Sequence, residues 1–203
     1  MLTLYHAPQS RSFRTLWLLE ELGVSYAIQN VAIRRRGQGE PPPDSYRQIH
    51  PHGKVPALVH DGVPVFETPA IALYLTDLFP DRGLGPLAGD PLRGPYLSWL
   101  AYSTGVFEPA IADSVRKIEN EPGPFGWASL EEVLTVLSRR LQAHPYLLAE
   151  AFSAADVVLG GAMQYLTRVG AMPETEPFSS YIERLADRPA LHRALQRDGG
   201  PIE

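Results

Sequence analysis

The segment that most constrains this chain is Lys54-Val55-Pro56-Ala57-Leu58-Val59, in which a proline stands at the start of an extended apolar run. Proline has no backbone N–H, so a sheet accepts it only at a strand's first residue, at an edge or at a bulge. The segment therefore predicts a strand from Ala57 and leaves backbone groups of Val55 available to a ligand. Taken alone, Pro56 is equally compatible with a trans proline that opens an edge strand.

A second segment, Glu67-Thr68-Pro69-Ala70-Ile71, places an acidic residue and a hydroxyl just before an apolar helical run. Thr68 suits the N-cap position and Pro69 the first helical position, so the segment is at least a helix start. The first N–H groups of a helix have no intrahelical partner and can hold an anionic group. Together with Val55, this pattern predicts a site for a small peptide-like molecule that bears a carboxylate.

Composition narrows the possible chemistry. The chain has 203 residues, a formal net charge of −5 and no cysteine. The negative charge disfavours a phosphate-backbone partner, so we expect no nucleic-acid binding. The absence of cysteine excludes disulfides, thiolate metal sites and a cysteine nucleophile, so any reactive thiol must come from the ligand. No apolar run approaches the roughly 20 residues that span a bilayer, so we expect no membrane association.

Hydrophobic periodicity predicts alternating strands and helices over the first part of the chain. Leu16, Leu19 and Leu22 recur at helical spacing, and Gly23 is a good helix stop. Asp61-Gly62 is a strong signal for a two-residue hairpin turn. The expected elements are strands at 2–5, 26–33, 57–60 and 65–66, and helices at 14–22 and 68–79.

Residues 80–91 are dense in glycine and proline, which is typical of a linker. Beyond them the sequence gives only helical patterns, at 92–119, 129–144, 154–169, 178–186 and 190–197. We therefore predict an α/β domain over 1–79, a linker over 80–90 and an all-helical domain over 91–203.

With these motifs in this order, the chain resembles the cytosolic glutathione S-transferases, and in particular serine-type bacterial members of the theta-like and beta-like groups. The resemblance covers nearly the whole chain. It is carried by the segments from Leu4 to Arg14, from His50 to Leu58, from Phe66 to Ile71 and from Phe152 to Asp156.

The resemblance implies a thioredoxin-like N-terminal domain with a mixed four-stranded sheet and a βαβ-ββα order, joined to an all-α C-terminal domain. It implies glutathione as co-substrate and no metal. Pro56 corresponds to the family's cis-proline, and the Val55 backbone would pair with the cysteinyl part of glutathione. Glu67 would lie near the γ-glutamyl ammonium, and Thr68 would donate to the α-carboxylate.

The glycyl end of glutathione has three candidate partners. Lys54 could pair with the glycyl carboxylate, and His52 and Gln48 are further candidates for that end. The resemblance also implies a cytoplasmic homodimer with a role in detoxification.

The thiol-activating group is predicted with alternatives. Only the thiolate is nucleophilic, and the pKa of an ordinary thiol lies near about 8.5. Ser10 matches the serine of theta-like and many bacterial members, and Ser12 and Tyr5 are the alternatives. Ser10 is also suited to cap the first helix, and the two roles are compatible because a cap lies beside the helix dipole.

The leading prediction is a transferase that joins the glutathione sulfur to a small apolar electrophile. One alternative is a glutathione-dependent isomerase, dehalogenase or peroxidase on the same fold. Ser10-Arg11-Ser12 replaces the Ser-Ser-Cys run of zeta-type isomerases, which argues against that class. A second alternative is a non-catalytic binding protein, against which Glu67-Thr68 and Lys54 argue.

The remaining polar residues have structural interpretations. Ser153 and Asp156 precede an apolar run in the manner of a capping box, so we expect a buried helix cap. His6, His50 and His144 are isolated in the sequence, and no pair has metal-ligand spacing.

Overall fold

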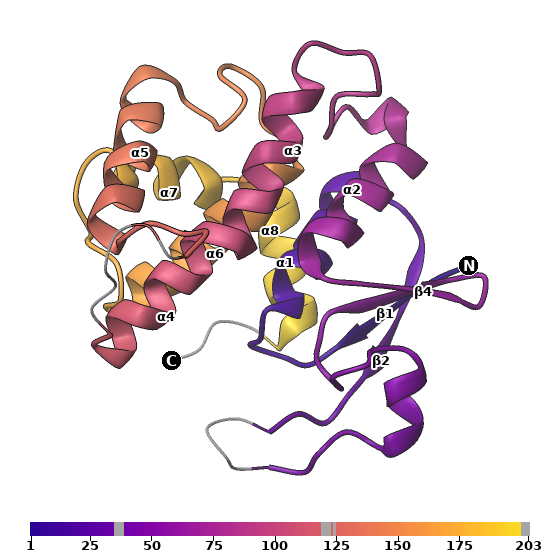
Figure 1. Cartoon of the computed structure of the whole chain (residues 1–203). Helices are drawn as coiled ribbons and strands as arrows, with labels where there is room; N and C mark the ends of the chain where they lie inside the picture. Colours follow the sequence, from indigo (N-terminus) through magenta and orange to yellow (C-terminus); the bar gives the residue numbers. More distant parts are fainter. Residues whose placement is uncertain (35–38, 119–122, 124, 200–203) are drawn as a thin grey trace. The chain divides into compact units, whose positions relative to one another are not determined.

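Four strands form the centre of the first of two structural units in this computed structural model (Figure 1). The structure describes residues 1–34, 39–118, 123 and 125–199. The first unit comprises Met1–Leu75 together with the segment from Arg188, and the second comprises Thr76–Asp187. The strands are β1 (Leu2–His6), β2 (Tyr26–Asn30), β3 (Ala57–His60) and β4 (Val63–Phe66).

The sheet is mixed, with the strand order β2-β1-β3-β4. β1 and β2 are parallel and are connected through α1 (Ser12–Leu22), which completes a βαβ unit. β3 is antiparallel to both β1 and β4, and α2 (Thr68–Leu78) follows β4. This is the predicted βαβ-ββα order of a thioredoxin-like domain, and the fold prediction is confirmed.

The helical periodicity read from the sequence corresponds to a buried face. Leu16, Leu19 and Leu22 of α1 are almost completely shielded from solvent, as predicted. They share the buried interior of the first unit with apolar side chains from the strands and from α2. Removing this much apolar surface from water is the main favourable contribution to folding. The other large, fully buried side chains of this unit are Leu4, Trp17, Leu18, Leu58, Ile71 and Leu75.

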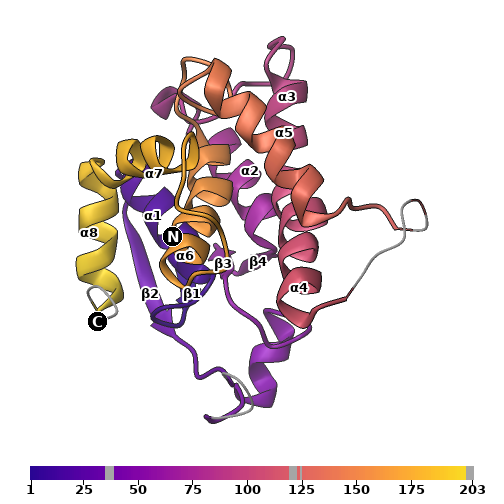
Figure 2. The same cartoon turned by 90° about the vertical axis from the view of Figure 1, so that its left-hand side faces the viewer.

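The helix α8 (Pro189–Asp198) belongs to the first unit although it lies near the end of the chain. It runs beside α1 (Figures 1 and 2). The guanidinium of Arg188 donates to both carboxylate oxygens of Glu21, at 2.6 and 2.8 Å. Arg193 and Arg197 donate to the carboxylate of Glu20. The predicted boundaries at 79 and 91 stay predictions, but this docking of α8 was not foreseen.

The second unit is helical, and its helices fall close to the predicted ranges. The helix predicted over 92–119 contains a π-helical segment, Ser103–Phe107, and ends at Arg116, where Lys117 takes a left-handed conformation. A second π-helical segment, Asp156–Gly160, precedes α6. The regular helices are α3 (Arg93–Tyr102), α4 (Glu108–Arg116), α5 (Leu130–Ala143), α6 (Gly161–Arg168) and α7 (Phe178–Ala186).

In the part of the chain that the structure covers, no helix combines the length and the apolar character needed to cross a membrane.

Asp156 organises the interior of the second unit. Its carboxylate is fully buried and accepts hydrogen bonds from the Ser153 backbone N–H and hydroxyl, at 2.9 and 3.0 Å. It also accepts from the Leu147 N–H and the Tyr181 hydroxyl, both at 2.9 Å. Burial raises the pKa of Asp156, and these hydrogen bonds act in the opposite direction. The predicted structural role of Ser153 and Asp156 is confirmed.

We therefore expect Asp156→Ala to lower the free energy of unfolding by about 3–5 kcal/mol, because buried donors left without acceptors each cost about 1–3 kcal/mol. Chemical denaturation measures the effect. The matched control is Asp187→Ala, at an exposed aspartate of the same unit, which should change the free energy by less than about 0.5 kcal/mol. Equal losses for the two variants would contradict the role given to Asp156.

Candidate functional site

One set of paired residues across the sheet brings three segments of the predicted site to the same end of the first unit. Ala57 of β3 pairs with Tyr5 of β1 on one side and with Phe66 of β4 on the other. β1 then leads into the loop that carries Ser10, Ala57 directly follows the proline, and β4 leads into Glu67-Thr68. Since β3 runs antiparallel to both neighbours, these three connections leave the sheet at the same end of its strands.

The peptide bond between Val55 and Pro56 is cis, which confirms the predicted isomer. Pro56 is buried and Val55 is half-buried. The ladder of β3 begins at Ala57, so the Val55 backbone lies outside the paired part of the sheet. The hydroxyl of Tyr46 donates to the Lys54 carbonyl at 2.8 Å and holds the chain just before this point.

Glu67 and Thr68 form the corner between β4 and α2. Glu67 has a φ of 70°, in the left-handed region that residues other than glycine adopt only at a cost. Its carbonyl accepts the Ile71 N–H at 2.9 Å and so starts α2. The Glu67 side chain is exposed, whereas Thr68 is buried. A non-glycine residue held in this conformation is typical of a position under functional constraint.

The loop that contains His52 and Lys54 is held from inside by His50. The His52 N–H donates to His50 Nδ1 at 3.3 Å, and the Gly53 N–H donates to the His50 carbonyl at 2.8 Å. Gly53 has a φ of 59°, and a Cβ there would lie 2.8 Å from Pro42 Cγ, so the turn requires glycine. The result is a fixed loop from which the side chains of His52 and Lys54 extend into solvent.

His50 itself is buried, and its ring centroid lies 5.4 Å from that of Phe66. Burial lowers the pKa of His50, with a smaller opposing effect from the charge of Glu67. The imidazole is therefore neutral near pH 7, which agrees with its Nδ1 acting as a hydrogen-bond acceptor.

Ser10 lies just before α1, on the loop that follows β1. Its hydroxyl oxygen accepts the Ser12 N–H at 3.2 Å, and its carbonyl accepts the Phe13 N–H at 3.0 Å. Arg11 occupies the N-cap position, one residue later than the predicted cap, although the Ser10 side chain still meets the first helical N–H. Ser10 is half-buried, so part of the residue is accessible to solvent.

The two alternatives to Ser10 have different surroundings. Ser12 has no exposed surface, and its hydroxyl lies 2.8 Å from both Ser10 Oγ and His6 Nδ1. It also accepts the Ala7 N–H at 3.1 Å. Tyr5 is half-buried in an apolar cluster in which its ring centroid lies 5.5 Å from that of Tyr46.

Three residues of this region were missed by the sequence analysis as parts of the site. Tyr46 and His50 hold the loop before β3, and Asp198 of α8 accepts the Gln9 N–H with both carboxylate oxygens, at 3.1 and 3.0 Å. Tyr46 and His50 lie within or near the motif that carried the resemblance, so their position in the sequence was a usable signal. Asp198 offered none, because its partner lies at the other end of the chain.

Gln48, the remaining sequence candidate, is exposed and ends a short 3-10 helix over Asp44–Gln48. Over residues 1–34, 39–118, 123 and 125–199, no group of three or more His, Asp or Glu side chains could hold a metal ion.

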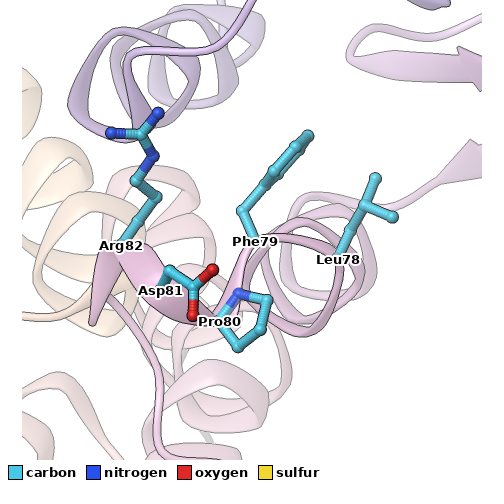
Figure 3. A pocket seen from close by; sticks show the side chains of 5 residues that line it. All are labelled: Leu78, Phe79, Pro80, Asp81 and Arg82. Atoms are coloured by element: carbon cyan, nitrogen blue, oxygen red, sulfur yellow. The ribbon is translucent and has the colours of Figure 1, made fainter.

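A separate hollow of about 260 Å³ lies in the second unit at the turn after α2. Figure 3 shows the five side chains that line it, from Leu78 to Arg82, and they do not converge on one point. None of the residues discussed above lines this hollow, so we assign it no role.

Comparisons with family models, with related proteins and with solved structures all point to the same protein family. The family model "Glutathione S-transferase, N-terminal domain" matches residues 1–77, and "Glutathione S-transferase, C-terminal domain" matches residues 81–197. Glutathione S-transferase 3 of Schizosaccharomyces pombe is 43% identical over 224 residues, which cover 97% of this chain and 88% of that protein. The disulfide-bond oxidoreductase YfcG of Escherichia coli K12 is 28% identical over 209 residues, which cover 96% of this chain and 94% of that protein.

A solved structure agrees with these matches. The glutathione S-transferase of a sphingomonad, complexed with glutathione, has a TM-score of 0.75 and 28% identity to this chain. The alignment covers 97% of this chain and 98% of that structure.

The lowered pKa of His50 predicts a pH-dependent stability. The His50 ring binds a proton less readily in the folded state than in the unfolded state. The contribution of neutral His50 to the free energy of unfolding is therefore complete above the ordinary pKa of 6.5, and it is lost as the pH falls through and below that value. We expect the free energy of unfolding to fall between about pH 7.5 and about pH 5.5 and His50→Gln to reduce this slope. Urea denaturation at several pH values measures it. His52→Gln, at the exposed neighbour, should leave the slope unchanged, and the proposal for His50 fails if both variants behave alike.

Proposed function

The chain belongs to the glutathione S-transferase family, and on that premise we propose that it binds glutathione in the first unit and activates the thiol through Ser10. The resulting thiolate attacks a small apolar electrophile and forms a thioether. The observation that carries this proposal is the register at Ala57, which leaves the Val55 backbone outside the β-ladder at the same end of the sheet as the Ser10 loop and the Glu67-Thr68 corner.

Three contacts would hold the tripeptide. The Val55 backbone pairs antiparallel with the cysteinyl residue, as an added strand does at an open sheet edge. The exposed carboxylate of Glu67 meets the γ-glutamyl ammonium, and Thr68 donates to the α-carboxylate beside the first N–H groups of α2. Lys54, or His52 or Gln48, meets the glycyl carboxylate.

Ser10 is favoured over its alternatives as the group that contacts the sulfur. It is half-buried at the start of α1, where both its hydroxyl and the helix dipole favour an anion. Ser12 has no exposed surface and supports Ser10 from behind. Lowering the thiol pKa by about 2 units requires about 2.7 kcal/mol of preferential stabilisation of the thiolate, which one charge-assisted hydrogen bond and a helix N-terminus can supply.

A second candidate function is glutathione-dependent reduction of disulfides, which the similarity to the Escherichia coli oxidoreductase favours. In that reaction the glutathione thiolate attacks a disulfide sulfur and releases one thiolate, and a second glutathione then cleaves the mixed disulfide. All sulfur atoms come from the ligands, because this chain has no cysteine. Formation of oxidised glutathione from a small disulfide would identify this activity.

A homodimer, a cytoplasmic location and a role in detoxification follow from the family resemblance, and they stay predictions.

The proposed thiol activation is tested with reduced glutathione and chlorodinitrobenzene. Ser10→Ala should raise the apparent pKa of the bound thiol by about 1–2 units and lower kcat near neutral pH about ten- to hundredfold, since each unit is a factor of ten. The pH–rate profile measures both effects. Ser10→Thr keeps the hydroxyl and should retain most activity, and Ser25→Ala, at an exposed serine of the same unit, should match the parent. An unchanged profile in Ser10→Ala would rule out this assignment.

The proposed grip on glutathione is tested by calorimetry. Glu67→Gln and Thr68→Val should each raise the Kd for glutathione about tenfold, because each removes one contact to a charged group of about 1.5–3 kcal/mol. Thr68→Ser should bind normally, and Glu183→Gln, at an exposed glutamate of the second unit, serves as the surface control. Absence of glutathione binding by the unaltered protein would favour the non-catalytic alternative.

A further inference from the structure

A buried chain of polar side chains lies behind Ser10. Ser10 Oγ is 2.8 Å from Ser12 Oγ, and Ser12 Oγ is 2.8 Å from His6 Nδ1. On the far side of the ring, His6 Nε2 is 3.0 Å from Asp198 Oδ1. Ser12, His6 and Asp198 expose 0%, 1% and 4% of their surface, so Ser10 is the one member that a ligand can reach.

The carboxylate of Asp198 is fixed at the end of this chain by two sets of contacts. Both of its oxygens accept the Gln9 N–H, which belongs to the same loop as Ser10. The helix that carries it is docked on α1 by ion pairs of Glu20 with two arginines of α8 and of Glu21 with Arg188, the residue just before α8. The approach of His6 Nε2 to Oδ1 is close but outside the angles of a good hydrogen bond, so the interaction between ring and carboxylate is mainly one of charge.

The hydrogen-bonding capacities and distances favour one direction of donation when His6 is neutral. The negative charge of Asp198, 3.0 Å from Nε2, favours the ring proton on that nitrogen, which leaves Nδ1 as an acceptor. The single proton of Ser12 has two acceptors within reach, His6 Nδ1 at 2.8 Å and the Ala7 carbonyl at 3.2 Å. Ser12 donates to the nearer acceptor, His6, and accepts from Ser10. Ser10 consequently donates inward and presents a lone pair to its accessible side, where it can accept a thiol S–H but cannot donate to a thiolate.

The opposite direction holds when His6 carries protons on both nitrogens. Nδ1 then donates to Ser12, Ser12 donates to Ser10, and the Ser10 hydroxyl points its proton outward. In this state Ser10 can donate to a thiolate, as the proposed function requires.

We propose that His6 is the acceptor of the glutathione thiol proton, which reaches it through Ser10 and Ser12. The inference rests on the proposed function. The S–H bond breaks and its proton bonds to Ser10 Oγ, the Ser10 proton moves to Ser12 Oγ, and the Ser12 proton bonds to His6 Nδ1. Three protons shift, and the products are a thiolate and an imidazolium, so one negative and one positive charge form and the net charge is unchanged. After the conjugate leaves, the reverse sequence returns the proton from Ser10 to water.

The charges inside the unit favour this transfer. Before it, the buried cluster contains the carboxylate of Asp198 beside a neutral ring, and afterwards it contains an ion pair. A buried charge is costly unless it is paired, so the proton on His6 stabilises the buried carboxylate of Asp198. The thiolate is in turn stabilised by the hydrogen bond that the Ser10 hydroxyl donates to it. The groups that face His6 in the described contacts are Asp198 from α8 and the hydroxyl of Ser12 from α1, and Asn30 of β2 is its neutral partner across the sheet. α1 also carries Arg14, a buried cation two residues beyond Ser12.

The direct test follows the protonation of His6 by nitrogen NMR of histidine-labelled protein at one pH near neutrality. The chain has six histidines, and His6 is assigned by the signal that is missing in His6→Asn. We expect a neutral ring protonated on Nε2 in the free protein and a doubly protonated ring in the complex with reduced glutathione. The ultraviolet absorbance of the thiolate is recorded on the same samples.

This experiment separates the inference from the proposed function. If glutathione binds and its thiol ionises while His6 stays neutral, the relay is wrong and the transferase proposal stands. If glutathione does not bind, the proposed function fails first. S-methyl glutathione, which has no thiol proton to give, should bind and leave His6 neutral, and a doubly protonated ring with that ligand would also overturn the relay.

Variants supply a second measurement. His6→Asn keeps a hydrogen-bonding group near Ser12 but cannot take a proton, and Asp198→Asn keeps the shape of the carboxylate without its charge. Each should raise the apparent pKa of the bound thiol by about one unit and lower kcat near neutral pH about tenfold, with the KM for glutathione changed less than about threefold.

The matched control is Arg193→Gln, which loosens the docking of α8 on Glu20 without touching the relay. It should lower the melting temperature slightly and leave the thiol pKa unchanged. A purely structural role for His6 and Asp198 predicts parallel losses of stability and of glutathione affinity with an unshifted thiol pKa, and that result would overturn the proposal.

Discussion

The register of the sheet at Ala57 is the constraint on which the proposed site depends. Ala57 pairs with both Tyr5 and Phe66. The segment that contains the proline, the loop after β1 and the corner after β4 therefore lie at the same end of the strands. A slip of one residue in either ladder would turn the side chains of β3 to the opposite face and separate these connections. The chemistry of the site is thus specified first by backbone pairing and only then by the side chains that the loops carry.

Much of this fold could be predicted from local patterns. The strand at 57–60 and the helix at 178–186 were placed at their observed bounds, because a proline or a clear apolar period marks each of them. The strand predicted over 26–33 instead ends at Asn30, where the Val31 N–H turns to the His6 carbonyl. The π-helical segments and the cis peptide at Glu176–Pro177 carry no comparable local signal.

The candidate site divides in the same way. The residues proposed to bind glutathione could be named from the sequence because their motifs are short and contiguous, and the cis-proline was predicted from one of them. The supports behind them were not, because Asp198 and His6 meet only through the docking of a distant helix. In the sequence, Ser10 was preferred over Ser12 because it matches the serine of the related family members. The structure distinguishes them by burial, which depends on tertiary packing and cannot be read from a single sequence.

The discontinuity of the first unit also bears on how the protein is made. Its sheet and α1 are translated early, but the helix that fastens the loop before α1 is translated only after the whole helical unit. During synthesis, the face of α1 that α8 covers in the folded protein therefore stays exposed until α8 emerges from the ribosome. Helper proteins that shield apolar surface during synthesis would find their target on that face.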